Sequence, residues 1–271
     1  MHVRRFPVPV DTFAPGGTTN AYLLGDADDA ETILVDPAGR TDDLDRAVEA
    51  SDVAHVLVTH AHPDHVGGVA HYADETGATV WARTGREDRF EAATGVAPDR
   101  TFREGTTVGP ATVMETPGHA PDHVALTTDA GVLTGDLVVA EGSVVVGADE
   151  GDVRAYLTSL RRLYARDPDR LYPGHGPEID DPRAILERLI RHRLDREAKV
   201  LAAVSGGATG IDEILDAAYD KDLSGVRDLA RSTVAAHLEK LAVEEKVSWD
   251  GDAARGASGV ATSERDGPDR A

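Results

Sequence analysis

The sequence predicts an α+β fold in which two packed sheets are covered by helices and followed by a small helical module. Short β-type apolar runs, most of them closed by Gly, Pro or Asp, recur over the first two thirds of the chain. Segments with a helical spacing of apolar residues lie between these runs. Beyond residue 205 the pattern changes to short helices and a strand.

The individual elements follow from the same patterns. Apolar runs that end in turn residues predict strands within residues 2–10, 19–26, 31–39, 53–60, 77–82, 111–119, 122–129, 131–139 and 169–177. Apolar residues three and four positions apart predict helices over residues 42–50, with Thr41 as N-cap, and over residues 64–75, 87–93, 152–164 and 183–205.

The chain divides into three parts by composition. Residues 1–196 are expected to form the main domain. Residues 197–251 resemble a winged-helix module, with a helix near 209–219 followed by another helix, a strand and a turn. Residues 252–271 are rich in small and charged residues and have no apolar period, which predicts a disordered tail.

Composition excludes several classes of protein. The chain has no cysteine, so disulfides, zinc-thiolate sites and cysteine nucleophiles are excluded. No apolar run reaches the roughly 20 residues that a membrane helix needs, and the first residues lack the apolar core of a signal peptide. We therefore expect a cytoplasmic protein without a membrane partner.

The charge is strongly negative, at -21, and Asp outnumbers Glu by 32 to 17 while Lys occurs only four times. An Asp-rich and Lys-poor surface favours hydration in concentrated salt, which predicts a halophilic protein. The alternative is an ordinary acidic protein. In dilute buffer this charge would repel itself and destabilise the compact state.

Seven candidate metal ligands follow β-type runs. The stretch THAHPDHVGG, residues 59–68, comes directly after the apolar run HVLV and supplies four of them. The other three lie in Gly-containing turns within TPGHAPDH, LTGDL and LYPGHGP. Loops at strand ends are where a rigid scaffold usually presents its chemistry. The seven residues are His60, His62, Asp64, His65, His119, Asp136 and His175.

Imidazole and carboxylate are the ligands that zinc accepts where cysteine is absent. Two metal ions need about seven ligands, one of them a bridging carboxylate. A set of ordinary surface histidines is the alternative, but Pro-Gly-His at two separate strand ends argues against it.

The run THAHPDH resembles the H-x-H-x-D-H signature of the metallo-β-lactamase superfamily, and the three later candidates match its downstream ligands in order and context. The resemblance extends over residues 1–190 and makes residues 1–196 the catalytic domain. It implies a four-layer αβ/βα sandwich with two zinc ions per subunit at one edge. By this resemblance, His60, His62 and His119 hold the first zinc ion, Asp64, His65 and His175 hold the second, and Asp136 bridges them.

The same resemblance implies a metal-dependent hydrolase in which a hydroxide that bridges the metals attacks an ester-like bond without a covalent intermediate. Asp64 would orient this nucleophile and relay a proton, and Asp136 would fix the metal spacing. The flavodiiron branch of the superfamily typically has Glu where His62 stands, and persulfide dioxygenases need one metal only. The complete set in this chain therefore indicates hydrolysis.

The segment after PGHGP, with HRLDRE at residues 192–197, resembles the beta-lactamase-like group that carries a C-terminal winged helix. That group implies hydrolysis of a thioester, as in hydroxyacylglutathione hydrolase-like members. Two alternatives stay open. One is a single-strand-specific endoribonuclease that cleaves phosphodiesters, and the other is a non-catalytic metal-binding regulatory protein.

Substrate contacts are expected on a basic segment, because residues 154–196 carry ten Arg against seven acidic residues. Beside His175, such an edge would hold a small anionic ester or thioester, or single-stranded RNA. The alternative is that these Arg neutralise acidic neighbours along a helix. The candidate substrate-binding residues are Arg191, His192, Arg193 and Arg196.

The remaining expectations concern partners and supporting residues. Residues 198–251 carry six basic and ten acidic residues, so DNA is not an expected partner, and the family suggests a homodimer. His123 is expected to be a structural or supporting residue, and Asp36 to orient a metal ligand or to cap a turn. Asn20 and Tyr22 are interpreted as ordinary strand positions.

Overall fold

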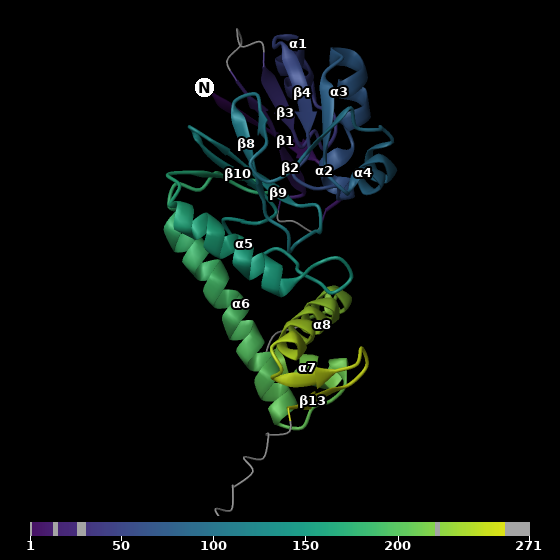
Figure 1. The fold of residues 1–271 in the computed structure, drawn as a ribbon, viewed down its shortest axis with the longest axis vertical. Helices are drawn as coiled ribbons and strands as arrows, with labels where there is room; N and C mark the ends of the chain where they lie inside the picture. The colour runs from purple at the N-terminus through teal and green to yellow at the C-terminus, as the bar shows by residue number, and fades with distance from the viewer. Residues whose placement is uncertain (1, 13–15, 26–30, 220–222, 258–271) are drawn as a thin grey trace, which may run out of the picture.

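The computed structural model describes residues 2–12, 16–25, 31–219 and 223–257. Two sheets form the body of the molecule, and a long helix leads from them to a C-terminal lobe (Figure 1). The larger sheet contains, in spatial order, β1 (Val3–Pro9), β2 (Thr18–Leu24), β3 (Thr32–Val35), β4 (Val53–Leu57), β5 (Thr79–Arg83) and β6 (Arg100–Phe102). The smaller sheet contains β11 (Leu171–Pro173), β10 (Gly131–Gly135), β9 (Val124–Thr128), β8 (Ala111–Glu115) and β7 (Thr107–Val108).

Parallel pairing places the ends of consecutive strands at one edge of each sheet. In the larger sheet, β3, β4, β5 and β6 are parallel, and β1 and β2 are antiparallel to their neighbours. In the smaller sheet only β10 and β11 are parallel. The loops that follow β4, β10 and β11 carry four of the seven candidate ligands.

Helices cover the outer face of each sheet, and the alternation of side chains along the strands explains why. Leu23, Leu34 and Val56 pack in one apolar cluster with the helices α1 (Asp42–Glu49), α2 (Pro63–Val66), α3 (Val69–Thr76) and α4 (Glu87–Thr94). Their neighbours Leu24 and Val35 belong to the cluster between the two sheets. Against the outer face of the smaller sheet lie α5 (Val153–Arg166) and α6 (Pro182–Ser205). The predicted four-layer arrangement is confirmed.

Helix starts follow the local sequence. The side chain of Thr41 accepts a hydrogen bond from the backbone of Leu44, as an N-cap does. Asp152 caps α5 in the same way, through the backbone N–H groups of Arg154 and Ala155. The helix predicted over residues 64–75 is instead two helices, because Gly67 and Gly68 separate α2 from α3.

The C-terminal lobe has its own apolar cluster, formed by the end of α6 with α7 (Ile211–Ala218), α8 (Arg227–Val243), β12 (Val247–Trp249) and β13 (Ala254–Gly256). The predicted domain boundary after residue 196 falls within the continuous helix α6. The first half of that helix packs against α5, and the second half packs against α7 and α8. A separate winged-helix domain over residues 197–251 stays a prediction.

The tail prediction is wrong at its beginning. Residues 254–256 form β13, which pairs antiparallel with β12 and buries Ala254 completely. In β13, as in β6 and β7, two or three residues with few apolar side chains show too little alternation to predict a strand. The rest of the predicted tail, residues 258–271, lies outside the described residues.

Within the described ranges, every helix is too short or too polar to cross a membrane. A cytoplasmic location and adaptation to high salt stay predictions from composition.

Leu160 on α5 is fully buried against the smaller sheet, whereas Leu194 on α6 is 39% exposed. We expect Leu160→Ala to lower the free energy of unfolding by about 2–5 kcal/mol, because the truncation leaves a cavity. Leu194→Ala is the matched control and should change it by no more than about 0.5 kcal/mol. Urea denaturation of both variants measures the difference, and equal losses would contradict the layer assignment.

His237 on α8 is fully buried, and burial together with the nearby Arg193 and Arg196 lowers the pKa of its imidazole to about 3. The unfolded chain takes up this proton near the ordinary pKa of about 6.5, so below that pH the unfolded state binds more protons and stability falls.

For His237 alone we expect a loss on the order of 3 kcal/mol between pH 7 and pH 4. His237→Leu should remove this part of the pH dependence in urea denaturation, and His71→Leu, at a half-buried position on α3, should not. A pH profile of His237→Leu that runs parallel to that of the unmodified chain would refute the assignment.

Candidate metal centre

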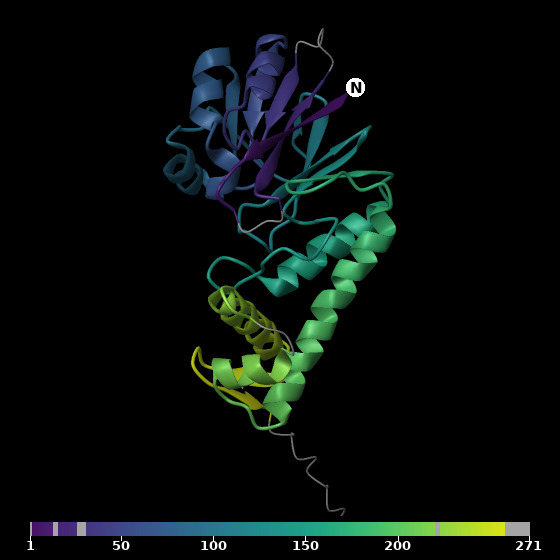
Figure 2. The ribbon, with the colours of Figure 1, turned by 180° about the vertical axis from the view of Figure 1, so that it is seen from behind.

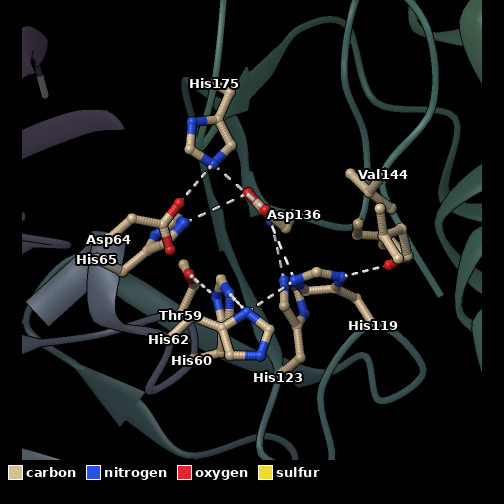
Figure 3. Close-up of polar contacts among 12 residues, drawn as sticks. Thr59, His60, His62, Asp64, His65, His119, His123, Asp136, Val144 and His175 are labelled. Atoms are coloured by element: carbon tan, nitrogen blue, oxygen red, sulfur yellow. Dashed lines mark hydrogen bonds and ion pairs between the residues drawn. The ribbon is translucent and has the colours of Figure 1, made fainter. Parts of the chain in front are cut away.

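Seven side chains from four segments of the chain converge at one edge of the sandwich (Figure 3). Two follow β4, two lie on the short helix α2, one lies between β8 and β9, and the last two follow β10 and β11. The structure therefore brings all the candidate ligands together. In that order they are His60 and His62, Asp64 and His65, His119, Asp136, and His175.

The ligand atoms form three overlapping groups, each with its atoms within 4.8 Å of one another. Asp136 lies between the two outer groups: its carboxylate oxygens are 3.5 Å from His65 Nε2, 3.6 Å from His119 Nε2 and 3.3 Å from His175 Nε2. The groups are His60, His62 and His119; His60, His65 and Asp136; and Asp64, His65 and His175.

Each histidine of the centre turns one nitrogen inward and has an oxygen next to the other. This second contact fixes the ring orientation, and with the hydrogen on the outer nitrogen the inner nitrogen can bind a metal. The outer contacts are His60 Nδ1 with Thr59 Oγ1 at 3.1 Å, His62 Nε2 with Glu150 Oε2 at 3.0 Å, His65 Nδ1 with Asp36 Oδ2 at 3.1 Å, His119 Nδ1 with the Val145 carbonyl at 2.7 Å, and His175 Nδ1 with the Thr18 carbonyl at 2.9 Å.

Asp36 orients the centre, which confirms the expectation for this residue. One carboxylate oxygen accepts a hydrogen bond from the Thr59 N–H at 2.6 Å, and the other accepts from the Thr59 hydroxyl at 2.8 Å and lies beside His65. Asp36 has a positive φ of 49°, a conformation that Asp and Asn tolerate better than most residues. Three short contacts from one buried carboxylate hold the start of the histidine-rich loop in place.

His123 is likewise a supporting residue, as expected. It is fully buried, with Nδ1 2.8 Å from the Thr116 hydroxyl, and its Nε2 accepts a hydrogen bond from the Asp136 N–H at 3.0 Å. Burial lowers the pKa of this imidazole to about 3, so it stays neutral and can accept. His123 thereby fixes the backbone of Asp136.

Asn20 and Tyr22 are not ordinary strand positions. The Asn20 side chain donates to the carbonyls of Pro173 and Gly176, each at 2.9 Å, and Tyr22 donates to the Pro173 carbonyl at 2.7 Å. Together they hold the loop that carries His175 against β2. The only signal for this role in the sequence is polar residues in an otherwise apolar strand.

Only glycine fits at position 174, because two ligands of the centre lie close to its backbone. A Cβ at this position would lie 2.6 Å from Asp136 Oδ1 and 2.8 Å from His65 Cε1, inside the centre itself. The glycine in the Pro-Gly-His turn therefore leaves room for the two neighbouring ligands.

Burial and neighbouring charges act together on the ionisable groups. Burial alone would raise the pKa of Asp136, but the nearby imidazole groups of His65 and His175 outweigh it and lower that pKa well below its usual value. Burial likewise opposes the charged form of His65, but the carboxylates of Asp36 and Asp136 raise its pKa well above the usual value. A metal ion would replace the proton on His65.

The centre fits a metal ion on structural grounds. His65 Nε2 and Asp136 Oδ1 are buried and have no hydrogen-bond partner among the described residues. Buried polar atoms are normally satisfied, so such a pair indicates a missing partner such as a metal. The donor set of imidazole nitrogens and carboxylate oxygens is one that zinc, iron and manganese accept.

A cavity of about 620 Å³ opens onto the centre. The structure does not bring the four predicted substrate-binding residues to its described lining. These residues are Arg191, His192, Arg193 and Arg196. Arg193 is 3% exposed and donates to the Val144 carbonyl, and the Arg196 guanidinium stacks on the Tyr219 ring at 3.5 Å. These planar cations thus pack on protein groups, namely an aromatic ring and a backbone carbonyl.

Comparisons with known proteins agree with this arrangement. A family model described as "Metallo-beta-lactamase superfamily" matches residues 14–175. The chain is 30% identical over 253 residues to "Beta-lactamase-like protein 2 homolog" of Drosophila melanogaster, covering 84% of each protein. It is 31% identical over 199 residues to "Atrochrysone carboxyl ACP thioesterase" of Aspergillus fumigatus, covering 69% of this chain and 59% of that protein.

Similarity to a solved structure includes the C-terminal lobe. A metallo-beta-lactamase family protein from Thermus thermophilus, TTHA1429, superposes with a TM-score of 0.73 at 25% identity. The match covers 94% of this chain and 98% of that one. The lobe after α5 is therefore shared with this neighbour rather than peculiar to this chain.

Asp36→Asn tests the role of the buried carboxylate. Asn keeps the shape and the positive φ, but it removes the charge and the acceptor beside His65 Nδ1. We expect zinc affinity to fall by about 10–100-fold, as for other supporting residues of metal sites. Competition with a chelating dye measures the affinity. Asp43→Asn, on the exposed face of α1, is the matched control, and an unchanged affinity in Asp36→Asn would show that the contact is dispensable.

Proposed function

The chain belongs to the metallo-beta-lactamase superfamily and is a metal-dependent hydrolase, and we propose that it uses two zinc ions to hydrolyse a thioester. The observation that carries the proposal is the complete set of ligand atoms in three adjoining groups. Support for a thioester comes from the relative named as an acyl-carrier thioesterase, which is 31% identical over the matched region.

In this proposal, the two outer groups of ligands would each hold one zinc ion, and Asp136 would contact both. Zinc bound by these residues would lower the pKa of a water molecule, which gives a nucleophile at neutral pH, and would polarise the carbonyl oxygen of the substrate. The ligands are oriented by hydrogen bonds of supporting residues, which hold the loops in place. These residues are Asp36, Asn20, Tyr22 and His123.

Asp64 is the residue that would handle the proton. Its Oδ2 lies 3.6 Å from His175 Nε2, its side chain is 18% exposed, and it lines the cavity. The carboxylate can therefore orient the attacking water and accept its proton. Water adds to the carbonyl carbon, the carbon–sulfur bond breaks, and the proton passes to the departing sulfur, so that the products are a carboxylic acid and a thiol.

The two other functions expected from the sequence, an endoribonuclease and a non-catalytic metal-binding protein, give different results in the same experiment. A homodimer also stays an expectation from the family.

The test uses the full chain with and without zinc, a thioester of the small thiol N-acetylcysteamine, and a labelled single-stranded RNA. We expect zinc-dependent release of the thiol and its loss on chelation. Asp64→Asn should lower kcat by about 10²–10⁴-fold, because the proton acceptor is removed. His62→Ala should lower the zinc content as well as the rate.

Asp74→Asn and His71→Ala, both on α3 and outside the centre, are the matched controls and should retain activity. RNA cleavage without thioester turnover would favour the nuclease. A zinc content well below one ion per chain, with zinc supplied, would favour the non-catalytic protein.

A further inference from the structure

The cavity in front of the metal centre has one wall that comes from the C-terminal lobe. Leu229 and Ser232, both on α8, line it together with Val139, Val144 and Val145 from the segment between β10 and α5. Figures 1 and 2 show this segment lying between the sandwich and α8 in both views. Val145 is 38% exposed and Leu229 is partly exposed, so apolar surface faces the cavity on both sides.

The segment of residues 139–151, which we call the pocket loop, is fixed by the C-terminal helices. Arg188 on α6 donates to the carbonyls of Val139, Ala140 and Gly142, and Arg193 donates to that of Val144. On the other side, the Ala148 N–H donates to the Ser232 carbonyl of α8 at 3.0 Å.

The pocket loop also touches the metal centre. The Val145 carbonyl accepts from His119 Nδ1, and Glu150 lies 3.0 Å from His62 Nε2 while Arg89 binds its carboxylate. The apolar wall is therefore held in a defined position relative to the ligands. It is a built surface rather than a loose loop.

The side chains that line the cavity include several carboxylates. Six acidic residues contribute to the described lining, and that lining contains neither Lys nor Arg. Two of the six belong to the metal centre, and the other four are exposed at the rim. Those four are Asp11, Glu141, Asp149 and Glu150. A carboxylate or phosphate at this rim, away from the metal centre, would be repelled, since the described lining offers it neither Lys nor Arg.

We propose that the substrate of this chain is a thioester with an uncharged, apolar acyl group, which lies between Val145 of the pocket loop and Leu229 of α8. This inference rests on the proposed thioester hydrolysis and specifies its substrate class. It disfavours the glutathione ester and RNA, because both carry negative charges that would lie near the acidic rim. Leu229 and Val145 are then specificity-determining residues supplied by remote parts of the chain.

The first experiment compares N-acetylcysteamine thioesters with acetyl, butanoyl, hexanoyl and octanoyl groups. We expect kcat/KM of the zinc-loaded full chain to rise by about fourfold per added methylene until the wall is covered. Leu229→Ser and Val145→Ser should flatten this rise by lowering kcat/KM of the longer esters. Leu194→Ser, on an exposed part of α6, is the matched control and should keep the full chain-length dependence.

Charge is tested with the lactoyl esters of glutathione and of N-acetylcysteamine over a series of salt concentrations. We expect the uncharged ester to be preferred at low salt. This preference should shrink as salt screens the negative charges of the rim carboxylates. A preference for the glutathione ester, or a rate independent of acyl length, would overturn the inference.

Measuring the affinity of a substrate analogue tests the apolar wall independently of the proposed reaction. Ketone analogues, in which CH₂ replaces the sulfur, cannot be hydrolysed, and calorimetry measures their affinity for the same chain. Affinity that rises with acyl length and flattens in Leu229→Ser supports the apolar wall, and length-dependent binding without any thioester turnover would overturn only the proposed reaction. Affinity that does not depend on acyl length would overturn the wall even if thioesters are hydrolysed.

Discussion

Burial of the Asp136 carboxylate is the constraint on which the site depends. An ionised carboxylate taken out of water costs several kcal/mol unless charged or hydrogen-bonding groups surround it. Here the partners come from other segments: His65 from α2, His119 from the β8–β9 loop and His175 from the loop after β11. The carboxylate is therefore stabilised only when the two sheets have packed, and the same packing assembles the metal centre.

A second layer of contacts makes that arrangement rigid. The outer nitrogens of His119 and His175 lie against backbone carbonyls, and His65 lies against the buried Asp36. Backbone groups in packed loops cannot rotate away as side chains can, so the inner nitrogens stay directed at one point. This preorganisation lowers the cost of ordering the ligands when a metal binds.

The C-terminal lobe is joined to the site rather than merely appended to it. Arg193 was expected to face an anionic substrate, but it lies buried on the Tyr156 ring and holds the Val144 carbonyl. The pocket loop that Arg193 supports includes the Val145 carbonyl, which accepts a hydrogen bond from His119 Nδ1. A change in the packing of α6 or α8 would thus displace both the cavity wall and one ligand of the centre, His119.

The sequence by itself determined the local features: the ligand motif at residues 59–68, the cap Thr41, and most of the strands and helices. Each of these is encoded within a few neighbouring residues. Only the tertiary structure decided that Asn20 and Tyr22 hold the His175 loop and that Leu229 walls the cavity. Contacts between residues more than 80 positions apart leave no periodic pattern, since they depend on how the layers and the lobe pack.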